Sequence, residues 1–239
     1  MAQIIEATSI DALWYKTMKT IMRDGEKFSG IQEIPNLILI LTKNFRSSPF
    51  FDKTFRKIFG DERIDYAGSV TFVQPEVEGL QGEKTYRTND DKKKWTNTYW
   101  GRLINWNGEG LNQIEGALKK LKGGKNTKMI SMSIYDPKSD INKVMGGVPC
   151  MTAVDIKPRN GFIDLTVMLR SMRFTKSGYA DVWALCEMGK FLAEESGNEL
   201  GSVTMMATSG HIFYSGDEFK NCDKMLKAMD AHKAKKRKR

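Results

Sequence analysis

The sequence has few of the residues that build disulfide or metal frameworks, because only three of its 239 residues are cysteines and two are histidines. Cys150, Cys186 and Cys222 stand at wide, unrelated spacings, which fits neither a disulfide framework nor a metal-binding pattern. With His211 and His232 as the only imidazoles, a zinc site would need carboxylates, and none cluster suitably. We therefore expect no disulfide and no metal site.

Long apolar runs are also missing. The longest candidate, residues 34–42, is interrupted by Pro35 and Asn36 and is far shorter than the roughly 20 residues that span a bilayer. The first residues, Met-Ala-Gln-Ile-Ile-Glu, lack the basic and then apolar pattern of a signal peptide. These features predict a cytoplasmic protein, and the hydrophobic fraction of 40% is ordinary for a globular domain.

The positive charge is concentrated at one end of the chain. The net charge is +9, and residues 220–239 contain nine Lys or Arg against two Asp, so the tail carries +7 and the body +2. We expect one domain over residues 1–219 and a basic C-terminal tail over residues 220–239. Its last run, Ala-Lys-Lys-Arg-Lys-Arg over residues 234–239, is typical of a solvated, disordered segment, with attraction of nucleic acid or of a nucleotide as the alternative.

Apolar periodicity indicates several elements. Residues 10–22 repeat apolar side chains every three or four positions after Ser9, which predicts an N-capped helix. The run 34–41 fits a buried strand or part of a helix equally well. Residues 69–73 are strand-like, whereas residues 81–94 are charged and predict an exposed loop.

The middle of the chain alternates between helix and strand patterns. Leu111, Ile114, Leu118 and Leu121 form one stripe before Gly123, which predicts a surface helix. Residues 129–135 then alternate in strand fashion.

Two extended runs, residues 150–156 and 162–170, flank an Asn160-Gly161 pair that tolerates the positive φ of a hairpin turn. In an antiparallel pair, Cys150 and Arg170 would lie at the same end of the sheet. A guanidinium beside a thiol favours the thiolate and lowers its pKa, which would make Cys150 a nucleophile. Taken alone, a single cysteine at a strand end is more often a small core residue, and Arg170 an exposed charge. Cys186 is expected in the core and Cys222 at the surface.

Downstream, Asp181 is placed to cap a helix with apolar spacing over residues 182–192, and a strand over residues 203–207 leads towards His211. The order of these motifs, and the spacing between them, resembles thymidylate synthases over roughly residues 95–216. The residues that carry the resemblance are Tyr99-Trp100-Gly101-Arg102, Asn112-Gln113-Ile114, Ser133-Ile134-Tyr135-Asp136-Pro137, Pro149-Cys150, Arg170-Ser171 and His211.

The resemblance implies a reaction and a fold. Cys150 would add to C6 of a pyrimidine nucleoside monophosphate, and C5 would then attack the one-carbon unit of 5,10-methylenetetrahydrofolate. Arg170 and Ser171 would bind the phosphate and His211 a sugar hydroxyl, although a loop histidine without ligand contact is the alternative. The implied fold is α+β, a twisted sheet packed on helices, in a homodimer formed through the sheet.

Two further positions follow from the same resemblance. Lys128 stands where the family has the first of two arginines that reach the partner's phosphate site, although it would serve equally as a plain surface charge. Asp181 stands where the family has an asparagine that reads uracil, and relatives acting on cytosine nucleotides have aspartate there. A carboxyl can accept from the cytosine N4 amino group and, when protonated, donate to N3. The alternative role of Asp181 is that of a helix cap.

Some positions depart from the family pattern. Arg173 replaces a folate-contacting aspartate, Met151 replaces a histidine, and Phe213 replaces the sugar-binding tyrosine, with Tyr214 one residue displaced. We therefore expect a pyrimidine-nucleotide C5 methyl- or hydroxymethyltransferase that favours a cytidylate, dCMP or CMP. The alternative is a nucleotide-binding paralogue without catalysis.

Overall fold

The computed structural model describes residues 2–60, 99–123, 127–143, 148–175, 177–214 and 216–237. Two sequence-based expectations, the strand at 69–73 and the loop at 81–94, lie outside these ranges. The strands are β1 (Gln3–Ala7), β2 (Glu26–Phe28), β3 (Ile31–Leu41), β4 (Ile130–Ser133), β5 (Met151–Arg159), β6 (Phe162–Leu169), β7 (Met172–Arg173) and β8 (Glu199–Phe213). The helices are α1 (Ile10–Asp24), α2 (Pro49–Phe59), α7 (Tyr99–Ile104), α8 (Gln113–Lys122), α9 (Pro137–Asp140), α10 (Gly178–Ser196) and α11 (Asp217–Arg237).

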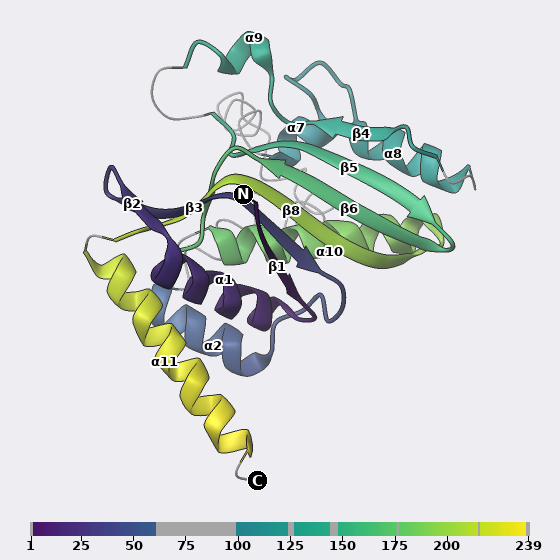
Figure 1. The fold of residues 1–239 in the computed structure, drawn as a ribbon. Coiled ribbons are helices and arrows are strands. Elements are labelled where there is room, and N and C mark those ends of the chain that lie inside the picture. The colour runs from purple at the N-terminus through teal and green to yellow at the C-terminus, as the bar shows by residue number, and fades with distance from the viewer. Residues whose placement is uncertain are drawn as a thin grey trace.

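All eight described strands join one mixed sheet (Figure 1). Its path is β1-β3-β8-β6-β5-β4, with β2 added to β3 and β7 added to β8. The hairpin β5–β6 is antiparallel, whereas β6 runs parallel to β8. The expected α+β fold, a sheet packed on helices, is therefore confirmed.

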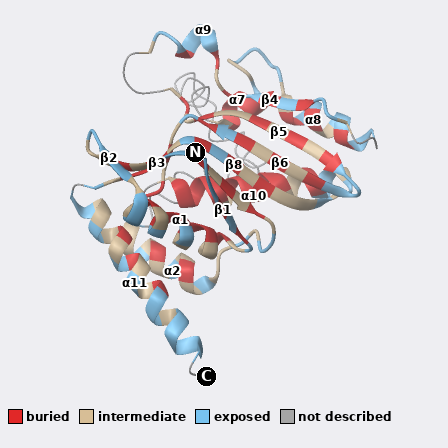
Figure 2. Cartoon of the chain, viewed as in Figure 1, coloured by how far each residue is buried: buried red, intermediate tan, exposed pale blue. Residues whose placement is uncertain are grey.

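Alternation along the strands buries one face of the sheet (Figure 2). One row of paired residues crosses the sheet on this face with at most 6% exposure, and it consists of Val154, Val167, Met205, Leu39 and Ile5. Helices α1, α8 and α10 contact the strands and cover this row. Because successive side chains of a strand point to opposite faces, the neighbouring row faces away from the core.

Local signals account for several of these elements. The Ser9 side chain accepts a hydrogen bond from Ala12 N at 3.2 Å and so caps α1 as predicted. Asn160 and Gly161 have φ of 53° and 82° and form the hairpin turn. Residues 34–41, which fitted strand and helix equally well, belong to strand β3.

Other elements differ from expectation in their bounds. Helix α8 begins at Gln113 after Asn112, which caps it, so Leu111 lies outside the helix and is 57% exposed. Helix α10 begins at Gly178, so Asp181 is inside its first turn and does not cap it. Strand β8 is longer than predicted and contains His211, which is therefore not a loop residue.

The C-terminal segment is helical as far as Arg237, and the predicted boundary at residue 220 falls inside α11. Cys222, expected at the surface, is fully buried together with Met225 and Met229. Further along, the Lys233 ammonium lies 3.3 Å from the centroid of the Tyr15 ring in α1. The expectation of disorder is therefore wrong for residues 234–237, which lie in α11, and apolar residues at helical spacing attach the earlier part of this helix to the core.

Candidate active site

Cys150 and Arg170 meet where the β5–β6 hairpin opens. Cys150 directly precedes β5 and Arg170 directly follows β6, and Arg170 N donates to Cys150 O at 2.8 Å. The guanidinium donates through Nε to Pro149 O at 2.9 Å and through Nη2 to Val148 O at 2.8 Å. Nη2 lies 3.8 Å from Cys150 Sγ. The predicted neighbourhood of thiol and guanidinium therefore exists in the fold.

The electrostatic balance at Cys150 differs from the expectation. Burial raises the pKa of the thiol, and the carboxyl of Asp181 adds to this effect. The Arg170 cation and a hydrogen bond with Tyr99 act in the opposite direction but do not overcome burial. The predicted lowering of the pKa is therefore wrong for the free protein, because removing a thiolate from water costs more than this half-exposed cation returns.

Asp181, which acts on the Cys150 thiol electrostatically, lies in the first turn of α10 and is 4% exposed. Its backbone N donates to Ser177 O at 2.7 Å. Burial raises the pKa of the Asp181 carboxyl to about 7. This carboxyl therefore holds a proton in a substantial fraction of molecules at neutral pH and can donate as well as accept a hydrogen bond.

Tyr99, at the start of α7, completes the cluster. Its hydroxyl has hydrogen bonds with the Cys150 thiol and with the backbone of Cys150 and Met151. Burial and the nearby Asp181 and Cys150 raise its pKa, so the phenol stays neutral. Tyr99 belongs to the motif Tyr99-Trp100-Gly101-Arg102 but is not among the predicted site residues, and its place in this motif is the signal that indicates it.

His211 lies on β8 and is 8% exposed. Its pairing partner across the sheet is Glu33 of β3, and its Nδ1 is 3.3 Å from Ser209 Oγ. Burial lowers the pKa of the imidazole, which favours the neutral ring. Ser171 is half-buried and connects Arg170 to β7, which pairs with β8 at His211. The phosphate candidates and the sugar candidate thus lie on adjacent strands.

Tyr214 and Lys128 do not join this cluster within the described chain. Tyr214 N donates to Gly30 O at 3.3 Å, and its ring lies 5.4 Å from the Lys27 ammonium. Lys128 is exposed, and its carbonyl accepts from Lys157 at 3.2 Å, near the end of β5 opposite Cys150.

The three replaced positions, Arg173, Met151 and Phe213, have contacts within the protein. Arg173 forms an ion pair with Glu218 of α11, and its guanidinium lies 4.2 Å from the centroid of the Phe213 ring. Thr175 donates to the same Glu218 carboxylate at 2.7 Å. Met151 is fully buried, so its side chain belongs to the core.

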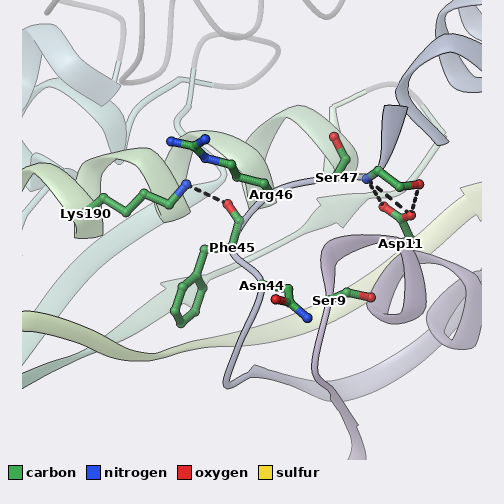
Figure 3. A pocket seen from close by; sticks show the side chains of 8 residues that line it. Ser9, Asp11, Asn44, Phe45, Arg46, Ser47 and Lys190 are labelled. Atoms are coloured by element: carbon green, nitrogen blue, oxygen red, sulfur yellow. Dashed lines mark hydrogen bonds between the residues drawn. The ribbon is translucent and has the colours of Figure 1, made fainter. Parts of the chain in front are cut away.

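A separate hollow of about 520 Å³ lies between the start of α1, the segment after β3 and α10 (Figure 3). None of the predicted site residues lines it. Lys190 donates to Phe45 O at 2.9 Å and to Glu187, while Asp11 accepts from Ser48. Its main buried charges therefore have partners within the protein.

The described residues contain no group of three or more His, Cys, Asp or Glu arranged to hold a metal ion. Within the same ranges, the helices are all too short or too polar to cross a membrane.

Comparison with known proteins gives a consistent result. The family model described as thymidylate synthase matches residues 74–235. A protein of Methanothermobacter thermautotrophicus named "Putative thymidylate synthase" is 28% identical over 238 residues, covering 95% of this chain and 100% of the relative. Proteins of the same name from Methanococcoides burtonii and Methanothermobacter marburgensis are 26% and 28% identical, over 89% of this chain and 90% and 94% of their own.

Proposed function

Because the chain belongs to the thymidylate synthase family, we propose that it transfers a one-carbon unit to C5 of a pyrimidine nucleoside monophosphate through Cys150. The observation that carries the proposal is the cluster in which Cys150 Sγ lies 3.8 Å from Arg170 Nη2, beside Tyr99 and the buried Asp181. A nucleophile, an anion-binding group and a base-reading group come from three separate segments of the chain. A structural cysteine would require none of these neighbours.

The proposed reaction begins with the Cys150 thiolate. The Sγ–C6 bond forms, and the electron pair of the C5–C6 double bond moves to C5. That pair forms the bond to the one-carbon unit while the bond between this unit and its donor breaks, and the donor keeps the electron pair of the broken bond. Loss of the C5 proton with expulsion of the thiolate then restores the double bond. Arg170 favours the thiolate form, and Tyr99 donates a hydrogen bond to it. Arg170 and Tyr99 must stabilise the thiolate more strongly than the resemblance implied, because burial raises the pKa of the Cys150 thiol.

Phosphate binding is assigned to Arg170 and Ser171. Arg170 is exposed, and its guanidinium donates through Nε and Nη2 to two backbone carbonyls, which fixes its orientation. A guanidinium with a fixed orientation loses little entropy when it binds an anion. Ser171 would add a hydroxyl donor, and His211 would bind a sugar hydroxyl, with Tyr214 as a further sugar contact.

A cytidylate, dCMP or CMP, is the preferred substrate in this proposal because of Asp181. A protonated carboxyl donates to cytosine N3 while its carbonyl oxygen accepts from the N4 amino group. The raised pKa of about 7 supplies that proton near neutral pH. The product is then a 5-hydroxymethyl derivative if water supplies the hydroxyl group, or a 5-methyl derivative if the donor also supplies a hydride.

The family generally takes its one-carbon unit from methylenetetrahydrofolate, and we proposed this donor from the resemblance. The described residues do not fit the family's folate contact at Arg173. A guanidinium only donates hydrogen bonds, whereas the aspartate that it replaces accepts them, and Arg173 is already paired with Glu218. No step above is therefore assigned to a bound folate, and the donor is a variable of the experiment.

We also propose a homodimer through the open face of the sheet. A row of paired residues on this face, Ala153, Met168, Met206, Ile38 and Ile4, is largely apolar. Within it, Met168 is 42% and Met206 37% exposed. Lys128 lies at the other end of β5 from Cys150, so it would reach a phosphate site only in a partner subunit.

The decisive experiment is release of tritium from C5-labelled dCMP, CMP, dUMP and UMP, with and without methylenetetrahydrofolate. Release from one nucleotide would demonstrate attack at C6 and identify base, sugar and donor. Cys150→Ser should reduce release by at least a thousandfold, because a hydroxyl of ordinary pKa is a far weaker nucleophile. Cys186→Ser, in α10 outside the cluster, is the matched control, with thermal unfolding reporting on its fold. Unchanged release in Cys150→Ser would reject the nucleophile.

The second candidate function is nucleotide binding without catalysis. The raised pKa of Cys150 and the pairing of Arg173 with Glu218 favour it. It predicts that the folded protein binds one of the four nucleotides but releases no tritium from any of them. Binding by calorimetry, measured alongside release, separates the two functions.

A further inference from the structure

Three polar side chains from two strands form a chain of contacts that ends at His211. Ser209 Oγ donates to Glu33 Oε2 at 2.5 Å and lies 3.3 Å from His211 Nδ1. Glu33 pairs directly with His211 across the sheet, and Ser209 precedes His211 by two residues. All three side chains therefore point to the same face.

The protons of this chain can be arranged in one consistent way. An ionised carboxylate only accepts hydrogen bonds, so the single hydroxyl proton of Ser209 is directed at Glu33. The Ser209 oxygen then has only lone pairs to offer His211, and Nδ1 must carry the proton between them. In a neutral imidazole only one ring nitrogen carries a proton, so a proton on Nδ1 leaves Nε2 with a free lone pair.

The surroundings favour a neutral ring. Burial is the largest effect that lowers the pKa of His211, and the Arg173 cation on β7 acts in the same direction. Glu33 on β3, Glu218 on α11 and the Ser209 backbone raise that pKa but do not reverse the balance. The ring of His211 has hydrogen bonds with the Ser209 hydroxyl, at Nδ1, and with the Ser209 backbone.

We infer that Glu33 and Ser209 are positioning residues that hold neutral His211 in the Nδ1–H form, so that Nε2 accepts a hydrogen bond from a hydroxyl of the ligand. The identity of that ligand as a nucleotide rests on the proposed function, whereas the tautomer does not. An acceptor at Nε2 selects a hydroxyl and disfavours a phosphate oxygen or a carbonyl, which have no proton to donate. The Glu33–Ser209–His211 chain thereby specifies an unmodified sugar hydroxyl at this point of the site.

Because the chain contains only two histidines, the tautomer can be read directly. Long-range proton–nitrogen correlation spectra of the ligand-free protein at pH 8 distinguish protonated from unprotonated ring nitrogens, and His232→Asn assigns the signals. The wild-type protein should show a protonated Nδ1 and an unprotonated Nε2 at His211. An Nε2–H form in the wild-type protein would overturn the inference.

Glu33→Gln is the sharpest variant. The glutamine amide can donate to Ser209 Oγ, which frees the serine proton for His211 Nδ1 and should move the ring to the Nε2–H form. Ser209→Ala should give a mixture of both tautomers, and Ser209→Thr should restore the wild-type spectrum. Unchanged spectra in both Glu33→Gln and Ser209→Ala would show that these residues do not set the tautomer.

Ligand binding separates this inference from the proposed function. Wild-type protein should bind dCMP about tenfold more tightly than 2′,3′-dideoxy-CMP, and Glu33→Gln should reduce this ratio to near one. Equal affinity for the two nucleotides in the wild-type protein would overturn the hydroxyl assignment. If no nucleotide binds while the Nδ1–H form is observed, the proposed function fails and the positioning role is supported.

Discussion

At the scale of single residues, Asp181 is an ionisable group that is deeply buried and has no ion-pair partner among the described residues. Burial alone accounts for the raised pKa of Asp181, and the Asp181 carboxylate in turn raises the pKa of Cys150 and of Tyr99. Such a carboxyl carries a cost for folding, because ionisation is easier in the unfolded chain. Residues of this kind are typical of functional sites, where the ligand uses the retained proton.

This cost predicts a pH dependence of stability. Between pH 4 and pH 7, the unfolded chain has released the Asp181 proton and the folded protein has kept it, so the free energy of unfolding falls as the pH rises. The fall levels off above the folded pKa of about 7 and reaches roughly 4 kcal/mol, at about 1.4 kcal/mol per pKa unit. Asp181→Asn should remove this slope in urea unfolding at several pH values.

Asp217→Asn is the control, because the Asp217 side chain is 90% exposed and should leave the slope unchanged. If the slope persists in Asp181→Asn, another group causes it. Asp181→Asn also tests whether this residue recognises the base, since an amide at position 181 should shift tritium release towards the uridylates. An unchanged preference would reject that role of Asp181.

At the scale of elements, a buried ion pair fastens α7 to α9. Arg102 Nη1 donates to Asp140 Oδ2 and Nη2 to Oδ1 at 3.0 Å, and Nη1 also donates to Ile134 O at 2.7 Å. Asp140 further accepts from Asp136 N at 3.0 Å and from Lys143 at 2.8 Å. Despite burial, these donors hold the pKa of Asp140 well below its usual range.

Removing the cation should therefore be costly. Arg102→Met leaves the Asp140 carboxylate in an enclosed place and should lower the free energy of unfolding by about 3–5 kcal/mol. Lys143→Met removes a partner that is 30% exposed and should cost about 1 kcal/mol or less. Denaturant unfolding at pH 7 compares the two variants. Equal losses of unfolding free energy in the two variants would mean that the buried Arg102–Asp140 ion pair contributes no more to stability than the Lys143–Asp140 pair.

At the scale of the whole molecule, the sheet has one face on the core and one face with an apolar row. A charge placed in that row is tolerated in a monomer but is costly inside a dimer interface. Met206→Glu should therefore raise the dissociation constant of the proposed homodimer by at least tenfold, which corresponds to about 1.4 kcal/mol. Sedimentation velocity over a range of concentrations measures this change.

Ile141→Glu is the matched control, because Ile141 is 68% exposed, lies directly after α9 and is not part of the apolar row of the sheet. A monomeric wild-type protein, or equal effects of the two substitutions, would contradict dimerisation through the sheet. If Lys128 acts on the partner's phosphate site, Met206→Glu should also raise the KM for the nucleotide at low protein concentration.

Local signals in the sequence predicted much of the fold near the site. Ser9 marked the start of α1 and Asn160-Gly161 the turn of the hairpin, because caps and turns depend on neighbours within a few residues. The bounds of α8 and α10 were less accurate, since several polar residues near each start were plausible caps. The buried face of α11 was missed because its many lysines dominated the composition.

What the sequence by itself determined is the hairpin that brings Cys150 and Arg170 to one end of the sheet, together with the motif order that indicates the family. The tertiary structure alone decided the signs of the electrostatic effects, because burial outweighs Arg170 at Cys150 and sets the proton on Asp181. It also decided the contact between Glu33 and Ser209, which are 176 residues apart. Pairings at that separation depend on how β3 and β8 meet in the sheet, and no local pattern specifies that meeting.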